Sequence, residues 1–175
     1  PRISAAALGW LFYTFCFVSI LTVLPPFLDP SQRAPVMGAM PLASIASSMT
    51  FGVWALRRMS AVSLVMWGFG SSAVCMMWLW ADPANISACI ALAAALGLIQ
   101  GGSFAVVPQL NETAVTQAQA NGAMAQMGNL GNTLGTPVMV AALAVFGYNA
   151  LPMFVGLALV LGLLAHFVTL VLRRA

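Results

Sequence analysis

The sequence contains no lysine and few charged residues of any kind, with six arginines and three acidic residues among 175. Soluble domains carry about 25% charged residues, whereas this chain has 5%, together with 62% hydrophobic residues and a mean hydropathy of +0.99. So few charges cannot cover the surface of a water-soluble domain of this length. The solvent around most of the chain is therefore expected to be lipid, and the expected fold class is an all-α integral membrane protein.

Cysteine is also scarce. The three cysteines, Cys16, Cys75 and Cys89, lie in apolar runs with no C-x-x-C spacing and no histidine nearby in sequence. Neither a disulfide framework nor a metal site is indicated, and no cofactor is expected. A net charge of +3 does not indicate nucleic acid as a partner, because the arginines stand at the ends of apolar runs rather than along one face.

Long apolar runs dominate what is present. A bilayer span needs ~20 predominantly apolar residues, and short breaks at charged residues, Pro and Asn divide the chain into six such runs. The predicted transmembrane helices cover residues 4–28, 36–56, 61–80, 86–109, 118–146 and 150–172. Residues 1–175 are thus expected to form a single six-helix transmembrane bundle.

The arginines predict the orientation of this bundle. In a six-span arrangement all but one of them fall on one side of the membrane: Arg2, Arg57, Arg58, Arg173 and Arg174. Arg33 alone falls on the other side. Because cytoplasmic loops collect Lys and Arg, both termini are expected in the cytoplasm of a multi-pass protein, in a bacterial cytoplasmic (inner) membrane.

The predicted helix over 118–146 is polar on one side. At ~100° per residue, Gln126, Asn129 and Thr133 share one stripe ~80° wide. Hydrocarbon offers such side chains no hydrogen-bond partners. Two interpretations are open: the amides hydrogen-bond a neighbouring helix, or they line a wet cavity that contacts a substrate.

Small residues mark the opposite side of that helix and recur in the fourth. Glycines let two helix backbones approach closely in lipid, most typically as G-x-x-x-G pairs. The candidate helix-packing glycines are Gly97, Gly101, Gly128, Gly131 and Gly135. We expect each of them to face a neighbouring helix.

Other polar and aromatic side chains lie on the fourth and first predicted helices. Gln100 is near mid-span with Phe104 one turn further on, a pattern typical either of a binding wall or of a structural helix contact. Trp10, Tyr13 and Phe17 share one face of the first helix. Packing is the commoner role of such a stripe, but the Tyr13 hydroxyl lies inside the bilayer and needs a partner. Tyr13, Gln100 and Phe104 join the amide stripe as candidate substrate-binding residues.

His166 lies in the last predicted helix, toward its cytoplasmic end. An ionisable side chain within a membrane is a functional candidate, and the alternatives are a proton relay and a capping or helix-interface histidine. Ser71 and Ser72 raise another possibility, an intramembrane serine protease, which needs serine and histidine at the same depth. These serines lie near mid-span, away from His166, so no enzyme activity is expected.

Three stretches carry a resemblance to a known family: "FGVWALRRMS" (51–60), "QGGSFAVVPQL" (100–110) and "ANGAMAQMGNLGNTLGTP" (120–137). With them, the whole chain resembles the carboxy-terminal six-helix half of a major facilitator superfamily transporter. Of that family's loop pattern G-x-x-x-D-R-x-G-R-R, the chain has Gly52 and Arg57, followed by Arg58. Leu56 stands where the family has its acid.

The resemblance implies a secondary transporter half that moves a small organic solute by alternating access. It also implies that the first, second, fourth and fifth helices border the central pathway. The expected partners are membrane lipid, the solute and a second six-helix half, which is either covalently attached or a separate chain. The alternative is a membrane scaffold or assembly subunit that has the same fold and transports nothing.

Overall fold

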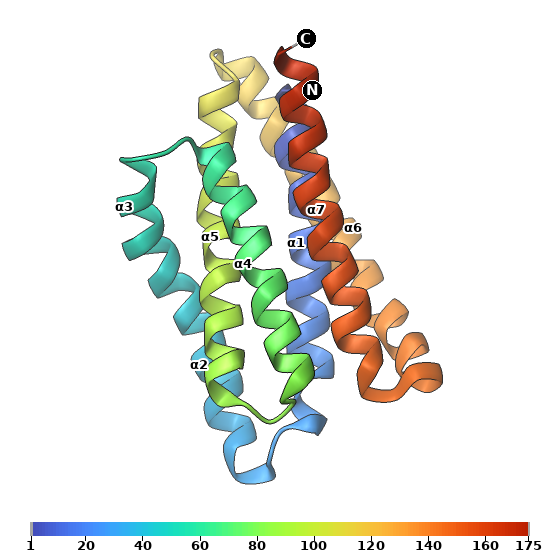
Figure 1. Ribbon diagram of the computed structural model, residues 1–175. Coiled ribbons are helices and arrows are strands. Elements are labelled where there is room, and N and C mark those ends of the chain that lie inside the picture. The colour runs from blue at the N-terminus through green and yellow to red at the C-terminus, as the bar shows by residue number, and fades with distance from the viewer. Residues whose placement is uncertain (1, 175) are drawn as a thin grey trace.

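The computed structural model describes residues 2–174, with side chains for residues 2–173. Over that range the chain is helical and contains no strand, as the predicted all-α class requires. The long helices form an elongated bundle, and the two chain ends lie at the same end of it (Figure 1).

The described chain contains six long helical segments. They are α1 (Arg2–Val23), α2 (Pro30–Ser47) continued by η2 (Ser48–Gly52) and α3 (Val53–Leu56), α4 (Ala61–Ala81), α5 (Ile86–Leu110), α6 (Ala114–Phe146) and α7 (Ala150–Arg174). Five helical stretches in the described chain are long and apolar enough to cross a membrane, and the fifth, Ala114–Arg173, holds two antiparallel helices. These are α6 and α7, which meet at the 3-10 helix η3 (Gly147–Asn149).

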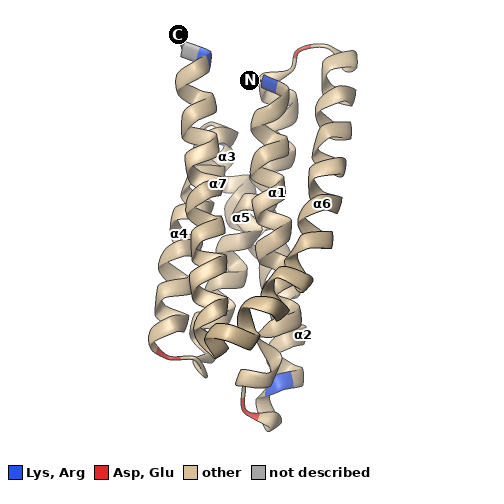
Figure 2. Ribbon diagram, turned by 90° about the vertical axis from the view of Figure 1, so that its right-hand side faces the viewer, with Lys and Arg blue, Asp and Glu red and all other residues tan. Residues whose placement is uncertain are grey.

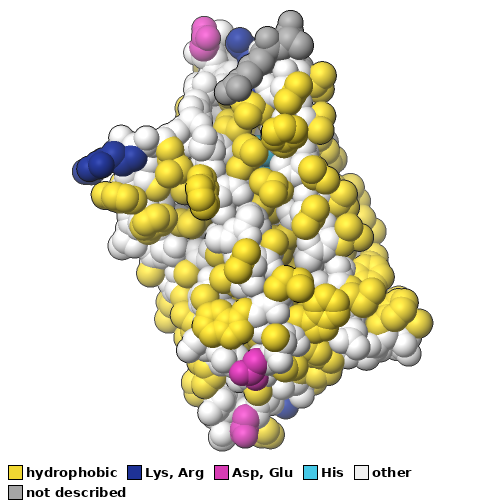
Figure 3. All heavy atoms as spheres, viewed as in Figure 1, with side chains coloured by type: hydrophobic (Ala, Val, Ile, Leu, Met, Phe, Trp, Pro, Cys, Tyr) yellow, Lys and Arg dark blue, Asp and Glu magenta, His cyan; other side chains and the backbone are white. Residues whose placement is uncertain are grey.

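Charged residues lie at the two ends of the bundle (Figure 2). Asp29 and Asp82 flank helix ends at one extremity, and Glu112 follows α5 at the other. Hydrophobic side chains cover the face between the ends (Figure 3). This distribution matches a bundle whose middle lies in lipid.

The first helix is shorter than predicted. We expected it to extend to residue 28, but α1 ends at Val23 and a 3-10 helix, η1, covers Pro25–Phe27. Two consecutive prolines have no backbone N–H to donate, so the α-helical hydrogen bonds cannot continue through them.

Two other helices begin earlier than predicted because polar residues cap them. The second helix was expected from residue 36, but α2 begins at Pro30, where Asp29 accepts a hydrogen bond of 2.9 Å from the Ser31 N–H. The fifth was expected from residue 118, but α6 begins at Ala114, after a capping box between Thr113 and Thr116. A hydropathy window misses such polar first turns, which capping side chains stabilise.

The helix α1 is central to the bundle. It packs on α5, α6 and α7, and α4 packs on α5 and α7. By contrast, α2 packs mainly on α5, and α6 mainly on α1. Both α2 and α6 therefore flank the bundle, each with a face that no described helix covers.

The contact between α1 and α6 is very close because glycines form it. A Cβ on Gly131 would lie 2.5 Å from the Leu11 carbonyl oxygen, and one on Gly135 would lie 3.2 Å from the Phe15 carbonyl oxygen. One on Gly128 would lie 2.6 Å from Nε1 of the Trp10 indole. All three glycines are buried on α1, so none of these three positions of α6 has room for a side chain.

Two more glycines bring α5 against the second span. A Cβ on Gly97 would lie 2.8 Å from the Ser44 carbonyl carbon, and one on Gly101 would lie 3.4 Å from Cβ of Ser48. Ser48 begins the π-helical segment η2. The irregular part of the second span is thus held by close contact with α5.

Candidate functional site

The polar side of α6 is uncovered. Gln126, Asn129 and Thr133 are all exposed, although they lie well inside a 33-residue helix. On the same stripe, a Cβ built on Gly122 meets nothing within 4 Å. The neighbouring helices of the described chain therefore leave this stripe open.

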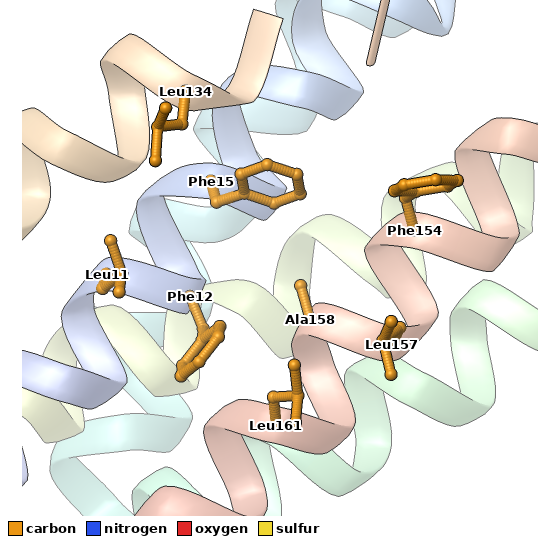
Figure 4. Close-up of a pocket in the computed structure, with 8 residues that line it drawn as sticks. All are labelled: Leu11, Phe12, Phe15, Leu134, Phe154, Leu157, Ala158 and Leu161. Atoms are coloured by element: carbon orange, nitrogen blue, oxygen red, sulfur yellow. The ribbon is translucent and has the colours of Figure 1, made fainter. Parts of the chain in front are cut away.

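An apolar groove gives the direction in which Asn129, at one edge of the stripe, points. Leu134 of α6 lines a groove of about 220 Å³ with residues of α1 and α7, among them Phe15 and Phe154 (Figure 4). This groove marks the side of α6 that faces α7. At ~100° per residue, Asn129 lies ~140° around α6 from Leu134. Asn129 therefore points away from α7, toward the side where α5 follows α1.

Asn132 belongs to the same surface, although sequence reasoning did not select it. At ~100° per residue, it lies ~160° from Leu134 and ~80° from the glycine line. It is exposed. The sequence alone could not distinguish Asn132 from its neighbours, because the directions in which α6 contacts α1 and α7 were not known.

Aromatic side chains of α1 and α5 lie beside the glycine side of α6. The ring centroids of Trp10 and Phe104 are 4.9 Å apart, and those of Trp10 and Tyr13 are 4.8 Å apart. Phe104 is 54% exposed, so no described helix covers it. The indole of Trp10 thus lies between Gly128 of α6 and Phe104 of α5.

Tyr13 and Gln100 meet through Ser44. The Ser44 hydroxyl donates a hydrogen bond of 3.5 Å to Oε1 of Gln100, and Ser44 also lies close to the Tyr13 side chain. This cluster joins α1, α2 and α5. Tyr13 is only 3% exposed, so it lies beneath the open surface, whereas Gln100 is half-buried at its edge.

The loop motif lies where the second span ends. Gly52 is buried in η2, and Arg57 and Arg58 are exposed between α3 and α4. The Arg58 guanidinium lies 5.6 Å from the centroid of the Trp54 ring, a cation–π contact. Trp54 lies in α3, so the aromatic partner of Arg58 comes from the short helix that precedes it.

His166 is fully buried at a helix interface. It packs on Gly9 of α1, where a Cβ would lie 2.9 Å from the imidazole Cδ2, and its ring centroid is 6.0 Å from that of Phe69 of α4. Neither imidazole nitrogen has a hydrogen-bond partner in the described chain. No Ser–His dyad forms, and the Ser71 hydroxyl donates to the Trp67 carbonyl at 2.8 Å.

Acidic, histidine and cysteine side chains do not gather in the described chain. Within the described residues, no group of three or more could hold a metal ion. The open surface therefore offers amides, hydroxyls and aromatic rings as binding groups.

No family model matches the sequence, and no curated protein matches it. The fold is similar to the crystal structure of the POT family transporter PepTSo, with a TM-score of 0.83 and 14% sequence identity. The match covers 95% of this chain and 37% of that chain. At this identity the similarity shows the fold alone. It confirms the predicted all-α fold class, a bundle of long apolar helices whose fold is similar to part of that transporter.

Proposed function

We propose that this chain is one half of a secondary transporter that moves a small organic solute by alternating access. In this proposal the solute pathway is bordered by α1, by α2 with α3, by α5 and by α6. One observation carries it: the amide side of α6 is exposed at membrane depth, well inside a 33-residue helix.

The amides exclude lipid as the environment of that face. Leaving a polar group without a partner in an apolar medium costs about 2–7 kcal/mol. Gln126, Asn129 and Asn132 are all exposed on one helix. Placing all three in hydrocarbon would incur this free-energy cost three times. Water, or a second half of the protein, must therefore cover them.

The helices α4 and α7 differ from α6 in the side chains that they expose. The most exposed side chains of α4 and α7 include Trp67, Val74, Leu157 and Phe167, all apolar. No comparable amide stripe occurs on these two helices. We infer that α4 and α7 face lipid, while the second half packs on α2 and α6 and encloses the open surface between them.

Charge in the pathway would come from the second half. The three acidic residues lie at helix ends, outside the hydrophobic middle of the bundle. This half therefore supplies hydrogen bonds and aromatic contacts, and a charged solute or a coupling proton takes its counter-charge elsewhere.

Cysteine accessibility tests the proposal without knowledge of the solute. In the complete protein, after its native cysteines are replaced, Gln126→Cys and Asn129→Cys should react with a membrane-impermeant methanethiosulfonate. The thiol must ionise to react, and ionisation requires water. Leu134→Cys, on the groove side of the same helix, should stay unmodified.

The scaffold alternative makes the opposite prediction. If folded Gln126→Cys and Asn129→Cys proteins react no faster than Leu134→Cys, the stripe is sealed against another protein surface. The pathway proposal would then be abandoned in favour of the scaffold.

A further inference from the structure

A polar pocket lies at the end of the bundle that carries both termini. Segments far apart in sequence form it: the start of α1, the link between α5 and α6, the first turn of α6 and the end of α7. Its lining residues are Arg2, Ile3, Asn111, Thr116, Leu172 and Arg173. Its volume is about 440 Å³, which is ample for a phosphate group and its substituents.

The guanidinium of Arg173 is the unusual feature of this pocket. Both of its terminal nitrogens are buried, and neither has a hydrogen-bond partner in the described chain. Burying a charged group without a partner is strongly unfavourable, and native structures normally pair such charges. An anion in the pocket would pair with both nitrogens.

Nearby charges strengthen this conclusion. The positive charge of Arg2 acts on Arg173, and two like charges close together destabilise each other unless an anion lies between them. Glu112 is the acid nearest in sequence to this pocket, but it is exposed and does not pair with the terminal nitrogens of Arg173. The described residues thus bring two arginines to one pocket and supply no counter-charge to the terminal nitrogens of Arg173.

The remaining wall is fixed and favours an anion. The Asn111 side chain donates to the Val107 carbonyl at 2.9 Å, and the Gln117 side chain donates to the Asn111 carbonyl at 3.0 Å. These bonds hold the link in place beside the N-terminus of α6, where the helix dipole adds positive potential. Thr116 lines the pocket on that first turn.

We propose that this pocket binds a phosphate group, with Arg173 and Arg2 as its counter-charges. Guanidinium groups match phosphate oxygens in geometry and charge. The phosphate can belong to the headgroup of an anionic lipid, because basic pockets between transmembrane helices recognise such headgroups, or to a soluble phosphate. The proposal does not depend on the transport function.

Thermal unfolding of the complete protein in nanodiscs tests this site. In phosphatidylcholine nanodiscs, added phosphatidylglycerol should raise the unfolding midpoint, because a ligand of the folded state stabilises it. Arg173→Met should weaken this response at least about 10-fold, the loss expected on removing a charge-assisted hydrogen bond. In phosphatidylcholine alone, the same variant should be at least as stable as the wild type, since it removes an unpaired buried charge.

Arg57→Met is the matched control. Arg57 lies in an exposed loop and does not line the pocket, so its variant should keep the phosphatidylglycerol response. A response to inorganic phosphate in phosphatidylcholine nanodiscs, lost in Arg173→Met, would also support the site and identify a soluble ligand.

Three results would overturn the proposal. They are an equal loss of response in Arg57→Met and Arg173→Met, no response of the wild type to either ligand, and an Arg173→Met protein that is less stable in phosphatidylcholine yet keeps its response.

Discussion

Gly131→Ala tests the contact between α1 and α6 most directly, because it adds one methyl group where the structure leaves no room. A Cβ on Gly131 would meet the Thr14 hydroxyl and would lie 2.5 Å from the Leu11 carbonyl oxygen and 3.0 Å from the Phe15 backbone nitrogen. The last two atoms belong to the backbone of α1, so a change of rotamer cannot relieve them. The two helices would have to separate.

The expected magnitude follows from two opposing effects. Overpacking a tight contact costs about 1–3 kcal/mol, whereas replacing a mid-helix glycine by alanine gains about 0.5–1 kcal/mol. Gly131→Ala should therefore lower the free energy of unfolding, by up to about 2.5 kcal/mol. Gly122 on the same helix is the matched control, since a Cβ there meets nothing within 4 Å. Gly122→Ala should stabilise the protein by about 0.5–1 kcal/mol.

Reversible unfolding in mixed micelles, followed by circular dichroism, measures both free energies. Size-exclusion chromatography checks that each variant remains monodisperse, and Gly131→Leu should fail to accumulate as folded protein. The close-contact interpretation is refuted if Gly131→Ala is as stable as the wild type, or gains stability as Gly122→Ala does.

Two further predictions concern the open surface and the topology. Gln126→Ala should weaken solute binding about 2- to 150-fold, as expected for a lost neutral or charge-assisted hydrogen bond, while Gln119→Ala, two turns nearer the helix start, should leave binding unchanged. Isothermal titration with a transported solute measures both, and equal affinities in folded proteins would contradict a contact at Gln126. Because all but one of the arginines fall on one side of the membrane, that side is expected to be cytoplasmic. A cysteine at Arg58 should therefore react with an impermeant maleimide only after the membrane has been permeabilised. Reaction in sealed cells would place Arg58 on the outer side of the membrane and would contradict the predicted topology.

The two sides of α6 could be predicted because helical periodicity alone separates them. Glycines three or four residues apart must share a face, and in lipid that face packs. The structure places Gly128, Gly131 and Gly135 against α1. The direction in which the amides point could be determined only from the position of α7. No local pattern in the sequence encodes that position.

Other features depend on contacts between distant segments. The burial of Tyr13 beneath Ser44 joins the first two spans, and the pocket around Arg173 joins both ends of the described chain. Hydropathy gave the apolar length of the helices but missed the ends where Asp29 and Thr113 supply caps. Those ends are set by single polar side chains rather than by average composition.

The central position of α1 has a consequence for biosynthesis. Its main partners, α5, α6 and α7, are all encoded later in the chain, and its close glycine contact begins only with α6 at Ala114. At ~5–20 residues per second, the ribosome needs on the order of 5–20 s to pass from the end of α1 to the start of α6. Through that interval α1 must persist in the bilayer without its partner, and its hydroxyls suit this: Thr14 donates to the Trp10 carbonyl at 3.0 Å and Thr22 to the Val18 carbonyl at 2.7 Å. The helix α1 thus satisfies part of its own polarity before the later helices that pack on it have been made.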